Sequence, residues 1–245
     1  MVSRIRSWKG NEIKVAQSRG GKISVCDYKD NLIVPASSTW PHPDIVKKLY
    51  QSKHVSDFDE PERHELAKEL GFYSDLQSLR SEDAITWSIF GTLHYFSKDR
   101  QIDFVNSLLD IIDVKISVND CFIELWTRIA HPDTIVSGGP ELDLEIVCDN
   151  LVIFGEAKWL SKVAEGQGKK KDKDQLQLRR EFMIRLGNRI FPKASKRLVL
   201  AVGLFETDPH VGQQSTTWEE ICTRTQHPLK SEITDYYFWK RKNGQ

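Results

Sequence analysis

The sequence predicts an α/β (α+β) fold in which helices flank a mixed central β-sheet, with an N-terminal extension before this core. Two observations predict this fold. Apolar residues recur at helical spacing in residues 81–112 and 175–186. Strand-like apolar segments lie between these helices and after them. The order of helices, several strands, helix, strand and helix is typical of a mixed sheet covered by helices.

The extension is predicted to comprise residues 1–75, and the core residues 76–245. Residues 4–34 alternate weakly between apolar and polar side chains and contain turn-forming pairs such as Gly20-Gly21, which is typical of short strands. Residues 44–80 show helical spacing in separate pieces. This extension carries no pattern that indicates a particular chemistry.

The elements of the core follow in chain order. A helix over 81–96 is predicted to begin at Ser81 as its N-cap, with Glu82 and Asp83 in the first turn, where the helix dipole favours acids. Apolar spacing predicts helices over 101–112 and 175–186 and strands over 122–129, 142–147, 151–159 and 197–205. A capping box of Thr217 and Glu220 predicts the start of a further short helix.

Composition excludes several classes of protein. The chain has 35 Lys+Arg, 35 Asp+Glu and 39% hydrophobic residues, which excludes a disordered chain and a protein that coats nucleic acid with its whole surface. The four cysteines form no C-x-x-C pair and the seven histidines show no spacing such as H-E-x-x-H, so no metal motif is evident. Without a signal-like start or an apolar run near the roughly 20 residues of a membrane span, we expect a soluble, cytoplasmic protein with no membrane partner.

Residues 141–158 carry the most informative pattern in the chain. If the Asp149-Asn150 pair forms a two-residue turn, Asp143 lies directly opposite Glu156, and Lys158 lies on the same face of the sheet. Opposed side chains have Cβ atoms about 4.5–5.5 Å apart, so two carboxylates placed there repel each other. Either Lys158 or a divalent cation can balance them, and a ladder of charges on an exposed strand face is the alternative interpretation.

Two features favour a functional site over an exposed ladder. Residues 151–155 are apolar on both faces, as in a central strand, so the charges at its end need a reason. Gly155 leaves room for another backbone or a ligand. Mg²⁺ prefers oxygen ligands and an incomplete protein shell, which Asp143, Glu156 and the Ala157 carbonyl would supply, with Lys158 beside the metal-bound water.

This constellation resembles the PD-(D/E)XK nuclease superfamily, which has the restriction-endonuclease-like fold with an Asp on one strand and Glu-x-Lys on the next. The matching residues are Asp143 and Glu156-Ala157-Lys158, and the Pro of the signature is displaced to Pro140. The resemblance covers roughly residues 80–205. It implies a Mg²⁺-dependent hydrolase, with Mn²⁺ as a substitute, that cuts DNA as an endonuclease in restriction, defence or DNA processing. It also implies a homodimer or a partner subunit of a larger nuclease system.

Two helices would complete the site of such a nuclease. The superfamily often carries a further acid on the first core helix, for which Glu82 is favoured over Asp83; alternatively, both acids only complement the helix N-terminus. On the later helix, Gln175 would hold a phosphate oxygen or water, and Arg179, one turn further, a phosphate, unless this is simply a solvated helix face. The predicted catalytic set is Glu82, Asp143, Glu156, Lys158 and Gln175, and the predicted metal ligands are Asp143, Glu156, Ala157 and Glu82.

Charge is distributed unevenly along the chain. Residues 158–200 hold 13 basic and 4 acidic side chains, a net charge of +9 that the rest of the chain balances. A phosphate backbone would be attracted to such a stretch, although charged loops are also often simply solvated. The predicted DNA-binding residues are Lys169, Lys170, Lys171, Lys173 and Arg179. A catalytically silent nucleic-acid-binding or assembly module of the same fold is the second hypothesis.

Overall fold

The structure is a computed structural model and describes residues 2–17, 21–36, 40–50, 75–134, 139–160, 165–205 and 213–244. The chain forms two compact units. Unit 1 comprises Met1–Tyr95 together with Ser231–Gln245, and unit 2 comprises Phe96–Lys230. This division differs from the expected boundary after residue 75, because the helix that carries Glu82 and the C-terminal helix both belong to unit 1.

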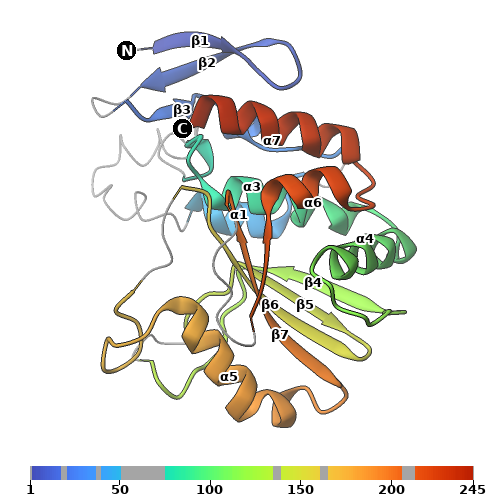
Figure 1. The fold of residues 1–245 in the computed structure, drawn as a ribbon. Helices are drawn as coiled ribbons and strands as arrows, with labels where there is room; N and C mark the ends of the chain where they lie inside the picture. Colours follow the sequence, from blue (N-terminus) through green and yellow to red (C-terminus); the bar gives the residue numbers. More distant parts are fainter. Residues whose placement is uncertain are drawn as a thin grey trace. The chain divides into compact units, whose positions relative to one another are not determined.

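Unit 1 contains a small antiparallel sheet in the order β1-β2-β3, which agrees with the short strands expected near the N-terminus (Figure 1). Ser81 is the N-cap of its helix α3, because its side chain accepts a hydrogen bond from the Ala84 N–H at 3.1 Å. This helix ends at Ile89 and continues as a 3₁₀ turn, so it is shorter than expected. The elements described in unit 1 are β1 (Val2–Arg6), β2 (Glu12–Gln17), β3 (Ile23–Val25), η1 (Tyr28–Asn31), α1 (Pro43–Tyr50), η2 (Asp75–Gln77), α3 (Glu82–Ile89), η3 (Gly91–Tyr95) and α7 (Lys230–Gly244).

The C-terminal helix α7 was not predicted, and it joins unit 1 through contacts with the start of the chain. The Tyr236 hydroxyl donates a hydrogen bond to the Asn31 carbonyl at 2.8 Å, and Lys240 Nζ donates to Asn31 Oδ1 at 3.2 Å. Lys240 is completely buried, and this burial lowers its pKa well below the usual value. Local periodicity cannot reveal contacts between residues about two hundred positions apart.

Unit 2 is built on a five-stranded mixed sheet in the order β4-β5-β6-β7-β8. The first three strands form an antiparallel meander, α5 connects β6 to the parallel strand β7, and β8 adds a further parallel pair. The mixed sheet predicted for the core is therefore confirmed. The elements described in unit 2 are α4 (Lys98–Ile111), β4 (Cys121–Leu125), β5 (Leu144–Cys148), β6 (Leu151–Ala157), α5 (Gln175–Ile190), β7 (Lys196–Gly203), β8 (Gln213–Thr217) and α6 (Trp218–Arg224).

Helix α5 covers one face of this sheet (Figure 1). Phe182 and Met183 of α5 belong to an apolar cluster that includes Phe154 of β6 and Val199 of β7. Every residue of β6 is buried, which confirms that it is a central strand. Helix α4 contacts β4, and α6 contacts β8. Within the described residues, no helix is long and apolar enough to cross a membrane.

Two local details differ from the sequence prediction. Strand β4 ends at Leu125 rather than at residue 129, because Trp126 takes a positive φ of 55° that an extended strand cannot accommodate. Gly155 does provide room for a close approach, but the approaching group is a side chain. A Cβ at Gly155 would lie 2.9 Å from the Cβ of Leu144 on the neighbouring strand.

Candidate active site

The β5–β6 hairpin brings Asp143 and Glu156 together. Leu144 pairs with Gly155 and Val147 with Val152, which is the register expected from a two-residue turn. Asp143 lies just before β5, and its Oδ2 accepts a hydrogen bond from the Ala157 N–H at 2.8 Å. The carboxylate of Asp143 is therefore fixed against the strand segment that carries Glu156.

The carboxylate of Glu156 is buried and lies next to two basic side chains. Glu156 is only 2% exposed. Lys158 Nζ donates a hydrogen bond to its Oε1 at 2.9 Å, and Arg179 Nη2 lies 3.6 Å from its Oε2. Oε2 is buried and has no hydrogen-bond partner within the described residues. One of its oxygens is thus held by the lysine, while the other has only a long contact with the arginine.

Arg179 is placed differently from the sequence prediction. We expected Arg179 either to bind a phosphate or to lie on a solvated helix face. It is instead 4% exposed, and its guanidinium lies near the Glu156 carboxylate and the Glu141 carbonyl. Nη2 also donates a hydrogen bond to the Glu141 carbonyl at 2.5 Å. Burial lowers the pKa of Arg179, and the negative charges of Glu156 and Asp143 act in the opposite direction. Arg179 therefore neutralises this acidic pair from within unit 2.

The spacing of apolar residues around Arg179 could have predicted that its side chain is buried. Leu176, Phe182 and Met183 stand three or four residues from Arg179, at the spacing that places side chains on one helix face. All three are buried in the cluster between α5 and the sheet. Arg179 thus belongs to the inward face of α5, where a charge requires a partner.

Both backbone polar groups of Lys158 form hydrogen bonds. The Lys158 N–H donates to the Val202 carbonyl at 2.8 Å, and the Lys158 carbonyl accepts from Trp218 Nε1 at 2.9 Å. The N–H and C=O of one strand residue point to the same neighbouring strand, so the Ala157 carbonyl faces the side on which Asp143 lies. The Lys158 side chain keeps 14% of its surface exposed.

These residues offer an oxygen-rich set of ligands that suits a hard cation. Carboxylates from Asp143 and Glu156 and the carbonyl of Ala157 are the kinds of group that bind Mg²⁺. Glu156 Oε2 is buried and has no hydrogen-bond partner within the described residues. A cation bound there would interact with this oxygen in place of a hydrogen-bond donor. The ligand chemistry therefore fits the expected ion, although Lys158 and Arg179 already supply positive charge.

The remaining predicted site residues fall into separate places. Gln175 is the first residue of α5 and is half-buried, one turn before Arg179. Glu82 is the first residue of α3 in unit 1, whereas the other predicted ligands lie in unit 2, so its role stays a prediction. Asp83, the alternative to Glu82, forms an ion pair with Lys48 of unit 1 at 3.2 Å.

The basic loop before α5 divides into two kinds of lysine. Lys169, Lys170 and Lys171 are exposed. Lys173 Nζ instead lies 2.7 Å from Asp133 Oδ2 and 2.6 Å from Glu181 Oε2. Its hydrogen bonds to these two carboxylates raise the pKa of Lys173. Lys173 therefore holds the loop against Asp133 and Glu181, whereas the three other lysines are open to solvent.

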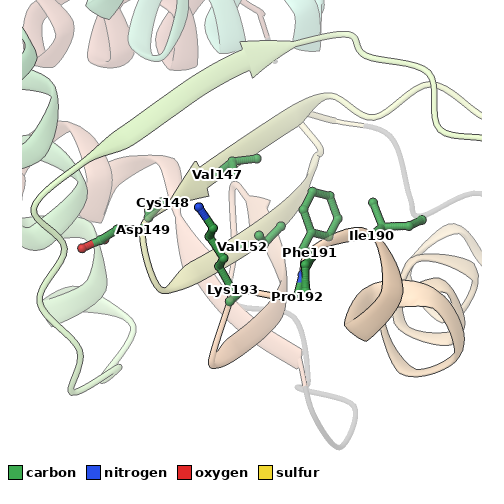
Figure 2. A pocket seen from close by; sticks show the side chains of 9 residues that line it. Val147, Cys148, Asp149, Val152, Ile190, Phe191, Pro192 and Lys193 are labelled. Atoms are coloured by element: carbon green, nitrogen blue, oxygen red, sulfur yellow. The ribbon is translucent and has the colours of Figure 1, made fainter.

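A pocket of about 280 Å³ lies at the other end of the hairpin, away from the two carboxylates (Figure 2). In Figure 2 the side chain of Lys193 lies beside the β5–β6 turn, and the ring of Phe191 lies on the far side of Val152 from the turn. Its lining is mostly apolar, in contrast to the charged site. The pocket is lined by Val147, Cys148, Asp149, Val152, Ile190, Phe191, Pro192, Lys193 and Ala194.

Comparison of the chain with models of known protein families, with curated proteins and with solved structures finds no significant match.

Proposed function

We propose that the chain is a Mg²⁺-dependent nuclease that hydrolyses phosphodiester bonds of DNA as an endonuclease, with a restriction-endonuclease-like core. The observation that supports this proposal is the arrangement at the end of the β5–β6 hairpin. Leu144 pairs with Gly155, so Asp143 and Glu156 are the next residues along the two strands. Asp143 is fixed to the Ala157 N–H, and Lys158 donates a hydrogen bond to Glu156. These are the residues in which the sequence resembles PD-(D/E)XK nucleases.

Each residue of the site has a distinct task in this proposal. Asp143, Glu156 and the Ala157 carbonyl would hold the ion. When bound, Mg²⁺ would polarise a phosphoryl oxygen and lower the pKa of a water molecule. Lys158 would orient the attacking water and stabilise the negative charge that develops on the phosphate. Arg179 is a positioning residue, because it contacts the buried carboxylate of Glu156 rather than solvent.

The proposal is tested by metal-dependent cleavage of DNA. We expect the purified chain to cut supercoiled plasmid in Mg²⁺ or Mn²⁺ and to be inactive in EDTA. Lys158→Met should lower the rate by roughly 10²–10³-fold, the usual cost of removing one preorganised electrostatic contact at a reacting centre. Cleavage that persists in EDTA, or that is equally fast in Lys158→Met, would contradict the mechanism.

A second candidate function is favoured by the charge balance of the site. Lys158 and Arg179 match the two acidic charges of Asp143 and Glu156, so the network can be neutral without a cation. A catalytically silent nucleic-acid-binding or assembly module of the same fold would need only this structural network. Binding of DNA without cutting in any of the metals would support this second function.

The exposed lysines of the loop provide a test of DNA contact that does not depend on cleavage. Each phosphate contact contributes about −0.9 to the slope of log K against log salt concentration. If all three lysines contact phosphates, replacing Lys169, Lys170 and Lys171 by Ala should make this slope shallower by about 2.7. The measurement is fluorescence anisotropy of labelled duplex DNA, in EDTA, at several salt concentrations.

Two control variants make this result specific. A triple Ala variant of the exposed lysines Lys9, Lys14 and Lys115 removes the same charge elsewhere and should change the slope little. Lys173→Ala should also change it little, because Lys173 is paired with two acids. An equal change of slope in both triple variants would indicate attraction by net charge alone.

A further inference from the structure

Three side chains of a kind that binds metals meet in unit 1, whereas the proposed nuclease site belongs to unit 2. His42 and Asp44 lie at the start of α1, and His94 lies in the 3₁₀ turn η3. One potential ligand atom from each residue lies within 4.8 Å of the other two. His42 and His94 are far apart in the sequence, which explains why no spacing motif revealed the cluster.

The spacing of His42 and Asp44 suits a shared ion better than a direct hydrogen bond. His42 Nδ1 lies 3.5 Å from Asp44 Oδ2. Charge-assisted hydrogen bonds between such groups are usually about 2.7–2.9 Å long. Two ligand atoms bound to a tetrahedral zinc ion, each about 2.0–2.1 Å from the metal, are about 3.3 Å apart. The pair is thus already close to the separation that zinc imposes.

His94 supplies a buried nitrogen, Nε2, that has no hydrogen-bond partner among the described residues. Its ring stacks on that of His42, with centroids 4.9 Å apart and an angle of 14° between the planes. A buried polar atom without a partner requires an explanation, and an ion bound to the nitrogen is one.

The cluster is partly shielded from solvent, and the side chain of His42 is 25% exposed. The side chain of Asp44 is 9% exposed, and the ring of Trp87 lies 5.4 Å from that of His42. Two contacts would compete with a metal. Lys47 Nζ donates a hydrogen bond to Asp44 Oδ1 at 3.1 Å, and the Asp44 N–H donates to His42 Nδ1 at a long 3.3 Å. Neither contact involves Asp44 Oδ2.

We propose that His42, Asp44 and His94 form a binding site for a divalent transition-metal ion, with Zn²⁺ as the best-fitting ion. Two imidazoles and one carboxylate are typical zinc ligands, and three protein ligands leave a fourth position for water or another group. Mg²⁺, which prefers oxygen ligands, is not expected to compete. The ion would join the start of α1 to η3 and so stabilise unit 1.

The test uses the full chain, freed of metal, and titrates it with Zn²⁺ in a calorimeter. We expect one ion to bind at this site, to raise the melting temperature, and to be retained in excess Mg²⁺. Asp44→Asn and His94→Gln should each weaken binding by more than about 100-fold, because loss of an outer-shell partner alone costs 10–100-fold. Lys47→Met should tighten binding, because it removes a cation that competes for Asp44.

Three controls separate this site from others in the chain. His131→Gln removes a histidine of unit 2 and should leave binding unchanged, as should Asp143→Asn, which alters the proposed nuclease site. With Co²⁺ in place of Zn²⁺, the absorption spectrum should show no thiolate charge-transfer band, which excludes the cysteines. The proposal is overturned if the wild-type chain binds no Zn²⁺, or if Asp44→Asn and His94→Gln bind it as tightly as wild type. If those variants do not fold, unchanged affinity in Lys47→Met or a thiolate band would overturn it.

Discussion

Asp143→Asn is expected to lower the rate of plasmid cleavage by about 10³-fold or more, with the fold retained. The amide oxygen of Asn still accepts the hydrogen bond from the Ala157 N–H, so the local backbone keeps its support. The negative charge that would hold the ion is lost. Loss of one preorganised electrostatic contact already costs roughly 10²–10³-fold in other enzymes, and a metal ligand should cost at least as much. The measurement is the initial rate of nicking in Mg²⁺, together with a circular dichroism spectrum.

A neighbouring carboxylate provides the matched control for this variant. Glu145 lies two residues after Asp143, on the same face of β5, and is also half-buried. Its Oε2 accepts a hydrogen bond from the Thr127 hydroxyl at 3.2 Å, and burial raises its pKa. Glu145→Gln removes the same charge nearby and should leave cleavage essentially unchanged. If Asp143→Asn cuts DNA as fast as Glu145→Gln, Asp143 does not hold the ion.

The part of this site that could be predicted from the sequence is the part determined by local rules. A two-residue turn fixes the pairing of a hairpin, and side chains alternate between its faces. These two rules predict that Asp143 lies opposite Glu156, and the observed register agrees with them up to the neighbouring pair of Leu144 and Gly155. The capping box of Thr217 and Glu220 was predicted for the same reason, since both partners lie within one turn.

The features that could not be predicted depend on contacts between distant segments. Lys173 is paired with Asp133, forty positions earlier, and nothing in the sequence indicates that it differs in this way from the other lysines of its loop. The helix that carries Glu82 was assigned to the core, but it belongs to unit 1, which also contains α7 from the other end of the chain. Sequence periodicity indicates that a face is buried without indicating what covers it.

Arg179→Met is expected to destabilise unit 2 by about 3 kcal/mol. Removing one partner of a buried ion pair typically costs 3–5 kcal/mol, because the other charge is left without compensation. The remaining hydrogen bond from Lys158 to Glu156 should keep the loss near the lower end of this range. Met keeps much of the apolar stem of Arg, so the measurement reports mainly on charge. The free energy of unfolding is obtained from urea denaturation.

Two further variants test this explanation. Arg180→Met removes the adjacent charge, which is less buried than Arg179, and should cost much less. The double variant Arg179→Met with Glu156→Gln should recover part of the loss, because the uncompensated carboxylate is gone. If Arg179→Met and Arg180→Met unfold at the same urea concentration, the buried pair contributes little to stability.

Arg179→Met also distinguishes the Mg²⁺-dependent nuclease from the catalytically silent module. If Asp143 and Glu156 bind Mg²⁺, the ion and the Arg179 guanidinium compete for the same carboxylates. Removing the guanidinium should then tighten Mg²⁺ binding, and added Mg²⁺ should stabilise Arg179→Met more than the wild-type chain. If the network is purely structural, Mg²⁺ should stabilise neither protein. A stabilisation by Mg²⁺ that disappears in Asp143→Asn would assign the effect to this site.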